Sequence, residues 1–182
     1  MGTAQAGEIQ GKVHRAVNLA RLLSKADKLA TCVVDNPPSL KQYVAKEIAV
    51  TPWLELTQER IRQFAEATGD HQWIHLDEER ARVGSPYGTT VAHGFLILSL
   101  ASYFLKEAVE IRRGVRFAIN YGLNRVRFPA AVRPNSRIRA RVTLLSLKEL
   151  PDSIEAIYSI SIESEGTSKP NCVAEWILRY YV

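Results

Sequence analysis

The spacing of apolar and polar residues changes near the middle of the chain. Between residues 57 and 110, apolar positions recur every three or four residues, which is the period of helices that pack along one side. After Gly114 they alternate with polar positions, and arginines separate Ile138, Ala140 and Val142. This alternation predicts antiparallel strands with one polar face. The expected strands cover 116–121, 125–128, 137–147, 153–162 and 172–181.

Three helices are expected before these strands. The first begins after Thr57, a suitable N-cap, and ends at Gly69, because glycine readily adopts the conformation that closes a helix. A short second helix is capped by Asp77. The third runs from His93 to Glu110 and is apolar on almost every face, which is typical of a buried helix. A buried helix followed by long antiparallel strands predicts an α+β domain whose sheet wraps around that helix.

The N-terminal residues follow a different pattern. Residues 9–31 have one apolar and one basic side, which predicts an amphipathic helix, and the tandem prolines of Asn36–Ser39 end it. We therefore expect an N-terminal helical arm over 1–44 and a main domain over 45–182. A basic amphipathic helix can lie on a membrane. Packing against its own domain or a partner subunit is the favoured interpretation.

The composition favours one ordinary globular domain. The chain has 182 residues, of which 46% are hydrophobic and 24% charged, so disorder of the whole chain is not expected. Cys32 and Cys172 are far apart and outside any CxxC motif, which argues against a disulfide framework and favours a reducing, cytoplasmic compartment. No secretory signal is visible, and the apolar run near Phe95–Leu105 is too short for a membrane span.

The net charge of +5 leaves two interpretations open. The excess of basic residues can simply solvate the surface. It can also bind a phosphate-bearing partner, either a nucleic acid or a phosphorylated cofactor. Aromatic residues interleaved with arginines are missing, and this weakens the case for nucleic-acid binding.

The candidate chemistry lies between residues 70 and 94. Asp70 follows the first helix, His75 lies on the same loop, and Gly94 begins the buried helix. A carboxylate beside an imidazole can activate water, and a backbone N–H at a helix start can donate to a developing oxyanion. This combination fits hydration of a carbonyl-conjugated double bond or hydrolysis of a thioester. His93 is more often a structural residue at such a position, and His71, His75, Asp70 and Asp77 lack a standard metal-ligand spacing, so no metal is expected.

Three stretches resemble the MaoC-like dehydratases, the family of the (R)-specific enoyl-CoA hydratases, and in particular its nodulation protein N-like subgroup. Phe64–Asp77 reads FAEATGDHQWIHLD, Thr90–Leu96 reads TVAHGFL, and Asn120–Ala130 reads NYGLNRVRFPA. The resemblance covers about residues 45–182 and leaves out the N-terminal arm.

The resemblance implies a hot-dog fold, in which a curved antiparallel sheet wraps a long central helix, and homodimers joined sheet edge to edge. It implies that Asp70 and His75 activate the water that adds to a trans-2-enoyl thioester in fatty-acid metabolism, and that the Gly94 N–H binds the thioester oxygen. The acyl carrier would be coenzyme A or acyl carrier protein, and no further cofactor is expected. The substrate-binding residues it implies are Trp73, Tyr87, Gly88, Thr89, His93, Asn124 and Arg125.

Two departures from the family pattern concern the substrate pocket. Gln72-Trp73 replaces the usual Asn-Pro, so the indole is expected to line the pocket, and Thr89 replaces a glycine and narrows the acyl entrance. Candidates for the phosphates of coenzyme A are Arg125, Arg127, Arg137, Arg139 and Arg141. Alternative functions are a hot-dog acyl-CoA thioesterase, a non-catalytic acyl-CoA-binding module and a nucleic-acid binder.

Overall fold

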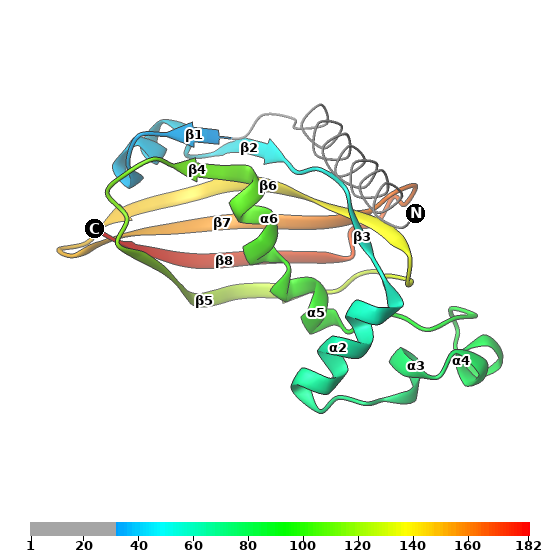
Figure 1. Ribbon diagram of the computed structural model, residues 1–182. Helices are drawn as coiled ribbons and strands as arrows, with labels where there is room; N and C mark the ends of the chain where they lie inside the picture. Colours follow the sequence, from blue (N-terminus) through cyan, green and yellow to red (C-terminus); the bar gives the residue numbers. More distant parts are fainter. Residues whose placement is uncertain (1–31) are drawn as a thin grey trace, which may run out of the picture.

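The computed structural model describes residues 32–182, and its centre is a six-stranded antiparallel sheet (Figure 1). The strands lie in the order β2-β6-β7-β8-β5, and β3 pairs with the far end of β6. Alternating residues of the long strands are buried, as the alternation in the sequence predicts. The bounds are β2 Lys46–Val50, β3 Leu54–Leu56, β5 Phe117–Arg127, β6 Ser136–Glu149, β7 Ser153–Ser164 and β8 Cys172–Tyr181.

The central helix crosses one face of this sheet in two pieces, α5 (Gly94–Ser99) and α6 (Ala101–Ala108) (Figure 1). The prediction of one unbroken helix was wrong at Leu100. The Ser99 hydroxyl donates to the Leu96 carbonyl at 2.7 Å, and such a bond to a helix's own backbone bends the helix. The predicted burial of every face was also wrong, because Phe95 remains 71% exposed.

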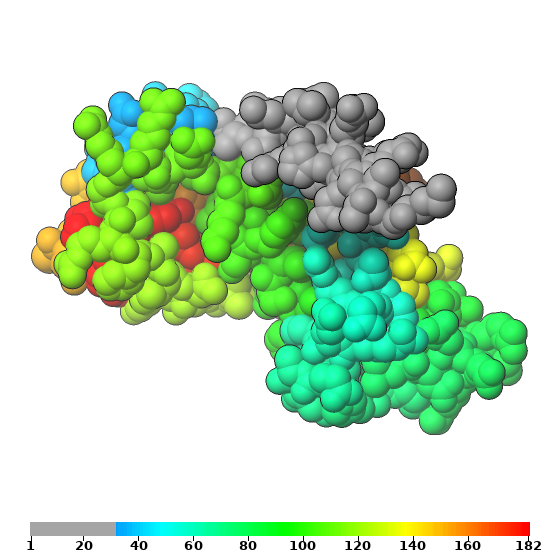
Figure 2. Space-filling view, viewed as in Figure 1, coloured from blue at the N-terminus to red at the C-terminus, as the bar shows by residue number. Residues whose placement is uncertain are grey.

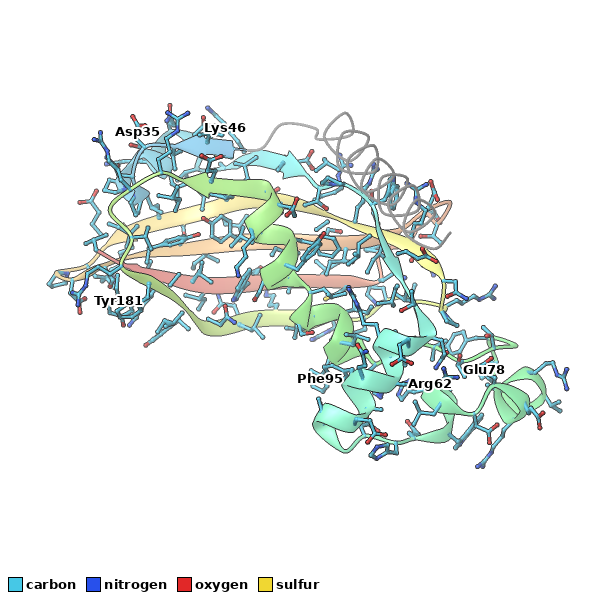
Figure 3. The ribbon with its side chains drawn as sticks, in the orientation of Figure 1. Asp35, Lys46, Arg62, Glu78, Phe95 and Tyr181 are labelled. Atoms are coloured by element: carbon cyan, nitrogen blue, oxygen red, sulfur yellow. The ribbon has the colours of Figure 1, made fainter. Side chains whose placement is uncertain are left out.

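Three short helices form a lobe beside the sheet rather than on it (Figures 1 and 2). They are α2 (Gln58–Thr68), α3 (Trp73–Leu76) and α4 (Glu78–Gly84). The predicted caps are confirmed: the Thr57 and Asp77 side chains each accept a backbone N–H, and Gly69 closes α2 with a φ of 74°. An ion pair of 2.7 Å between Arg62 and Glu78, both labelled in Figure 3, connects α2 with α4.

The described part of the expected arm packs into the domain. β1 (Cys32–Val34) pairs in parallel with β4 (Val109–Ile111), and the 3-10 helix η1 (Pro37–Tyr43) buries Leu40 completely. Core contacts therefore begin before residue 45, where the sequence placed the start of the domain. The helix expected over 9–31 lies outside the described residues. Between residues 32 and 182, no helix combines the length and the apolar character needed to cross a bilayer.

Strand β5 differs from the prediction of two separate strands. It is one continuous strand, and its register against β8 shifts between Asn120 and Gly122 and again between Leu123 and Arg125. Bulges of this kind let a strand continue through residues that interrupt its alternation. Because β5 pairs with β8 alone, its other side is an edge of the sheet in the described structure, and nine of its eleven residues are exposed.

Candidate active site

Asp70 lies where helix α2 ends and the chain turns toward α3. The left-handed Gly69 redirects the backbone, and the Asp70 side chain remains 55% exposed. The contacts that hold this turn locally are long: Asp70 N donates to Thr68 Oγ1 at 3.4 Å, and Gln72 N donates to Asp70 Oδ1 at 3.4 Å. The carboxylate is therefore accessible to a solvent molecule or a ligand.

Two hydrogen bonds hold His75 in place, one to its ring and one to its main chain. Its Nδ1 lies 2.6 Å from the Val91 carbonyl oxygen, and because that oxygen can only accept, Nδ1 carries the proton. The neutral ring then presents an unprotonated Nε2, which is the form required of a general base. The backbone oxygen of His75 accepts from Gln58 Nε2 at 2.8 Å. Gln58 in turn accepts from the buried Thr90 hydroxyl at 2.6 Å.

His93 lies between the two predicted catalytic residues. Its ring stacks on His75 with 3.7 Å between centroids and contacts Phe64 at 5.2 Å. Its Nε2 donates to the backbone oxygen of Asp70 at 3.0 Å and lies 3.9 Å from Asp70 Oδ2. Only 3% of His93 is exposed. Its prediction as a substrate-binding residue stays a prediction, and in the structure its side chain contacts Phe64, His75 and Asp70.

Gly94 is the first residue of α5 and lies under the ring of Phe128. An added Cβ at Gly94 would lie 3.1 Å from two atoms of that ring, so little space remains beside the backbone. Backbone N–H groups in the first turn of a helix have no intrahelical acceptor. The Gly94 N–H is thus a suitable donor to an incoming oxygen, as the sequence predicted.

The environment lowers the pKa of His75 below its ordinary value of 6.5. Burial is the largest cause, and the charge interaction with His93 acts in the same direction. The hydrogen bond to Val91 and the charge of Asp70 oppose this shift. The net effect keeps His75 unprotonated, and able to accept a proton, at neutral pH.

The same three side chains could in principle hold a metal ion, since Asp70, His75 and His93 bring one ligand atom each within 4.8 Å of one another. The two imidazoles, however, stack with only 28° between their planes, so their nitrogen lone pairs run side by side rather than converging on one point. His93 Nε2 already donates to Asp70. This geometry suits acid/base chemistry better than metal coordination.

Trp73 on α3 and three residues of the loop after α4 were predicted to bind the substrate, but they line three different cavities of the structure. Trp73 packs under the Arg80 guanidinium at 4.3 Å and faces a surface cavity that His71 also lines. Gly88 and Thr89 line a second cavity beside α4. Tyr87 lines a third cavity of about 600 Å³, which it shares with Phe128 and Arg133. Of this group, only Tyr87 shares a cavity with a residue that contacts Gly94.

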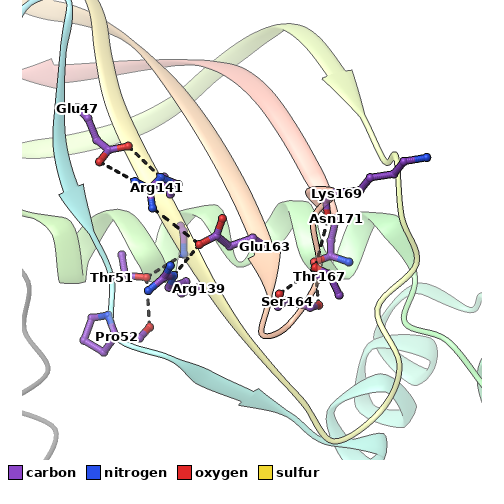
Figure 4. Close-up of polar contacts among 11 residues, drawn as sticks. Glu47, Thr51, Pro52, Arg139, Arg141, Glu163, Ser164, Thr167, Lys169 and Asn171 are labelled. Carbon is purple, nitrogen blue, oxygen red and sulfur yellow. Dashed lines mark hydrogen bonds and ion pairs between the residues drawn. The ribbon is translucent and has the colours of Figure 1, made fainter.

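Most of the arginines proposed for phosphate binding already have acidic partners. On the outer face of the sheet, Arg139 donates to Glu163 at 2.6 Å, and Arg141 makes two bonds to Glu47 (Figure 4). Arg137 pairs with Glu165. Asn124 and Arg125 lie on the exposed edge strand β5, where the Arg125 side chain is 82% exposed and 4.0 Å from Glu175.

An apolar groove runs along the central helix toward the other end of the sheet. A cavity of about 190 Å³ begins beside Leu98, and a cavity of about 410 Å³ continues it to Ile111. The two share Ser102, Asn120 and Trp176, which makes them neighbouring sections of one groove. Figure 2 shows its floor as the red atoms of β8 between α6 and the segment that precedes β5.

Several residues of the site were missed in the sequence. Gln58, Val91 and Phe128 hold His75 and Gly94 through contacts that span 16 to 34 positions of the chain. Val91 acts through its carbonyl group, which no sequence pattern can mark. Thr90 and Val91 did lie within the recognised motif, but their roles depend on the tertiary structure.

Comparison with known proteins supports one family. A family model described as a MaoC-like domain matches residues 40–163. 3-Hydroxyacyl-thioester dehydratase Z of Mycobacterium tuberculosis is 48% identical over 136 residues, which cover 74% of this chain and 89% of that protein. The chain belongs to the MaoC-like dehydratase family. The predicted enzyme class, a hydro-lyase, is confirmed with it.

Two further comparisons support the subgroup and the fold, respectively. Nodulation protein N of Rhizobium leguminosarum bv. viciae is 39% identical over 135 residues, covering 74% of this chain and 84% of that protein. The structure of an unliganded R-hydratase from Pseudomonas aeruginosa superposes with a TM-score of 0.61, at 19% identity, over 76% of this chain and 81% of that one. The predicted hot-dog fold is confirmed.

Proposed function

We propose that this MaoC-like dehydratase adds water to a trans-2-enoyl thioester and forms the (R)-3-hydroxyacyl thioester, or catalyses the reverse elimination. The observation that carries this proposal is the buried pair of rings at Asp70, in which His75 keeps Nε2 free because Val91 binds Nδ1. One relative is named a 3-hydroxyacyl-thioester dehydratase, and this name supports the proposal.

In the proposed hydration, His75 Nε2 removes a proton from a water molecule that Asp70 helps to orient. The water oxygen forms a bond to C3 as the C2–C3 π bond breaks, and the negative charge moves to the thioester oxygen, where the Gly94 N–H donates to it. The proton held by the pair then transfers to C2, which restores the thioester carbonyl. Every atom of the water molecule enters the product.

We place the acyl chain in the groove along α5 and α6, whose walls include Leu105, Val109 and Leu178. Its larger section, about 410 Å³, is within the range of ligand pockets. The groove begins one helical turn after Gly94, so a thioester bound at the Gly94 N–H can direct its chain into it.

We place the carrier arm of the thioester in the cavity lined by Tyr87, Phe128 and Arg133, since Phe128 also covers Gly94. Arg133 then replaces the ion-paired arginines as the candidate for a phosphate of coenzyme A or of an acyl carrier protein. Arg133→Gln is expected to raise KM for an enoyl-CoA with little change in kcat. Arg112→Gln, at the opposite end of the sheet, is the matched control, and an equal KM in both variants would exclude this placement.

Hydration is tested by the loss of the conjugated-enoyl absorbance of crotonyl-CoA, with released thiol measured in the same sample. Asp70→Asn and His75→Ala are each expected to lower kcat about a hundredfold or more. His71→Ala is the control, since His71 lies on the same loop but is exposed and contacts Glu66 of helix α2. Near-normal activity in the first two variants would refute the roles of the pair, and stoichiometric thiol release would favour the thioesterase instead.

We further propose that a second copy of the chain covers strand β5. This edge exposes Phe117, Ile119, Tyr121 and Leu123, each between 38% and 52% accessible, and an apolar edge strand invites pairing with another strand. A two-fold axis would bring two such edges together. Ile119→Lys is expected to give a monomer in light scattering. Leu145→Lys, equally exposed at 38% but on β6, is expected to leave a dimer, and monomeric wild-type protein would contradict the proposal.

A further inference from the structure

His93 holds the two catalytic side chains from one buried position. It reaches Asp70 across 23 residues of sequence through a hydrogen bond of 3.0 Å and covers the ring of His75 at 3.7 Å. The local bonds of the Asp70 turn are longer, at 3.4 Å. The contact with His93 is therefore shorter than either of the two local hydrogen bonds that Asp70 makes within its turn.

The structure also determines which nitrogen of His93 carries the proton. The Asp70 carbonyl oxygen can only accept, so Nε2 must donate. Among residues 32–182, His93 Nδ1 is the buried side-chain nitrogen or oxygen that has no hydrogen-bond partner. A buried N–H without an acceptor costs more free energy than a buried nitrogen that carries no proton and accepts no bond. The neutral form with its proton on Nε2 and none on Nδ1 therefore fits the site.

We infer that His93 is a positioning residue: its Nε2–H fixes the backbone of Asp70 while its ring fixes the plane of His75, so that the carboxylate and the His75 Nε2 address one water molecule. This inference rests on the proposed function for its kinetic consequence. His93 does not itself touch the substrate, since it is 97% covered by protein and its only donor is engaged.

Two neighbouring alternatives fit the geometry less well. As a second general base, His93 would have to act through Nδ1, which is sealed from solvent. As a purely structural residue, it would be expected to pack mainly on apolar core side chains, yet its ring contacts are to Phe64 and His75, and its hydrogen bond is to Asp70. Its contacts are thus concentrated on the residues that perform the chemistry.

The two contacts can be separated by substitution. His93→Phe keeps an aromatic ring against His75 and Phe64 but loses the donor to Asp70. His93→Gln keeps an N–H donor but loses the stacked ring. Each is expected to lower kcat about tenfold to a hundredfold with KM for crotonyl-CoA within about twofold, and His93→Ala, which loses both contacts, is expected to be the slowest. His71→Gln, a neighbouring surface histidine, is the control and should match the wild type.

A pH profile distinguishes positioning from loss of folded protein. The titratable groups that act on the pKa of His75 are His93 and Asp70, and the interaction with His93 lowers it. Its removal should move the acidic limb of kcat/KM to higher pH in both His93→Phe and His93→Gln. A His93→Phe enzyme with kcat within about twofold of wild type and an unmoved limb would overturn the inference.

The wild-type protein provides a test that needs neither folding of a variant nor turnover. Nitrogen-15 NMR of the imidazoles should show the Nε2–H form at His93 and the Nδ1–H form at His75. An Nδ1–H form at His93 would overturn the inference, because Nε2 could not then donate to Asp70. This readout stands even if the enzyme fails to hydrate crotonyl-CoA, so failure of the proposed function and failure of the positioning role are distinguishable.

Discussion

Gln58 offers a direct test of how the lobe holds His75. Its side-chain amide bridges two groups, since Nε2 donates to the His75 carbonyl at 2.8 Å and Oε1 accepts from the Thr90 hydroxyl at 2.6 Å. Gln58→Met keeps the length and the helix propensity of the side chain but removes both bonds. The fully buried Thr90 hydroxyl and the His75 carbonyl then lose their partner.

The expected cost follows from the number of groups left without a partner. Each unsatisfied buried polar group costs about 1–3 kcal/mol. Gln58 itself is half-buried, so water can reach the His75 carbonyl in part, and the lower end of the range applies to that group. We therefore expect Gln58→Met to lower the free energy of unfolding by about 2–4 kcal/mol. Thr90→Val leaves only the Gln58 amide oxygen without its partner, and solvent can reach that oxygen, so this variant should lower the free energy of unfolding by about 1 kcal/mol.

Urea unfolding of the two single variants and the double variant measures the coupling. The double variant removes both partners of the bond between Gln58 and Thr90. Its loss of unfolding free energy should therefore be about 1 kcal/mol smaller than the sum of the losses in the two single variants. Gln63→Met is the matched control, because Gln63 lies on the same helix and its amide donates to the exposed Glu59. If Gln58→Met costs no more than Gln63→Met, or if the double variant is additive, the bridge does not hold His75 as described.

Three further outcomes are expected. Because the pKa of His75 is lowered, the acidic limb of kcat/KM should have its midpoint below 6.5, and a midpoint above that value would mean that another group limits the rate. Gly94→Ala should lower kcat about tenfold or more by crowding the oxygen site, because the new Cβ meets the Phe128 ring at 3.1 Å. If adding Phe128→Ala restores the rate, the crowding acts through that ring rather than on the substrate. Burial raises the pKa of Tyr180 from 10 to about 12, so the phenol ionises first in the unfolded chain. Urea unfolding should therefore show stability falling between about pH 10 and 12, and falling less in Tyr180→Phe.

The parts of the fold that the sequence predicts are those with a repeated signal. Strands β7 and β8 each alternate over ten or more residues, and β6 alternates as far as Leu144. The polar faces of β6 and β7 carry ion pairs seen in Figure 4. The strands β1 and β4 have three residues each, which is too short for any period to show. Strand β5 was divided in error because its two bulges break the alternation.

The same distinction applies to the site. Asp70, His75 and Gly94 follow from residue type together with recognised helix ends, and the structure brings Asp70 and His75 together as expected. The role of His93 could not be predicted, because its partner is a backbone carbonyl 23 residues away. Trp73 was expected in the pocket on the basis of its neighbours in sequence, but the cation of Arg80 one helix later binds its ring face.

The site is built mainly from side chains that bind the main chain of another segment. His75 binds the carbonyl of Val91, His93 binds that of Asp70, and Gln58 binds that of His75. The long strands contribute none of these bonds, since all of them lie within the lobe and the start of α5. Substitutions that break them should therefore change kcat well before they unfold the sheet, whereas substitutions in the strand core, such as Ile160→Ala, should lower stability and leave the rate of the remaining folded enzyme unchanged.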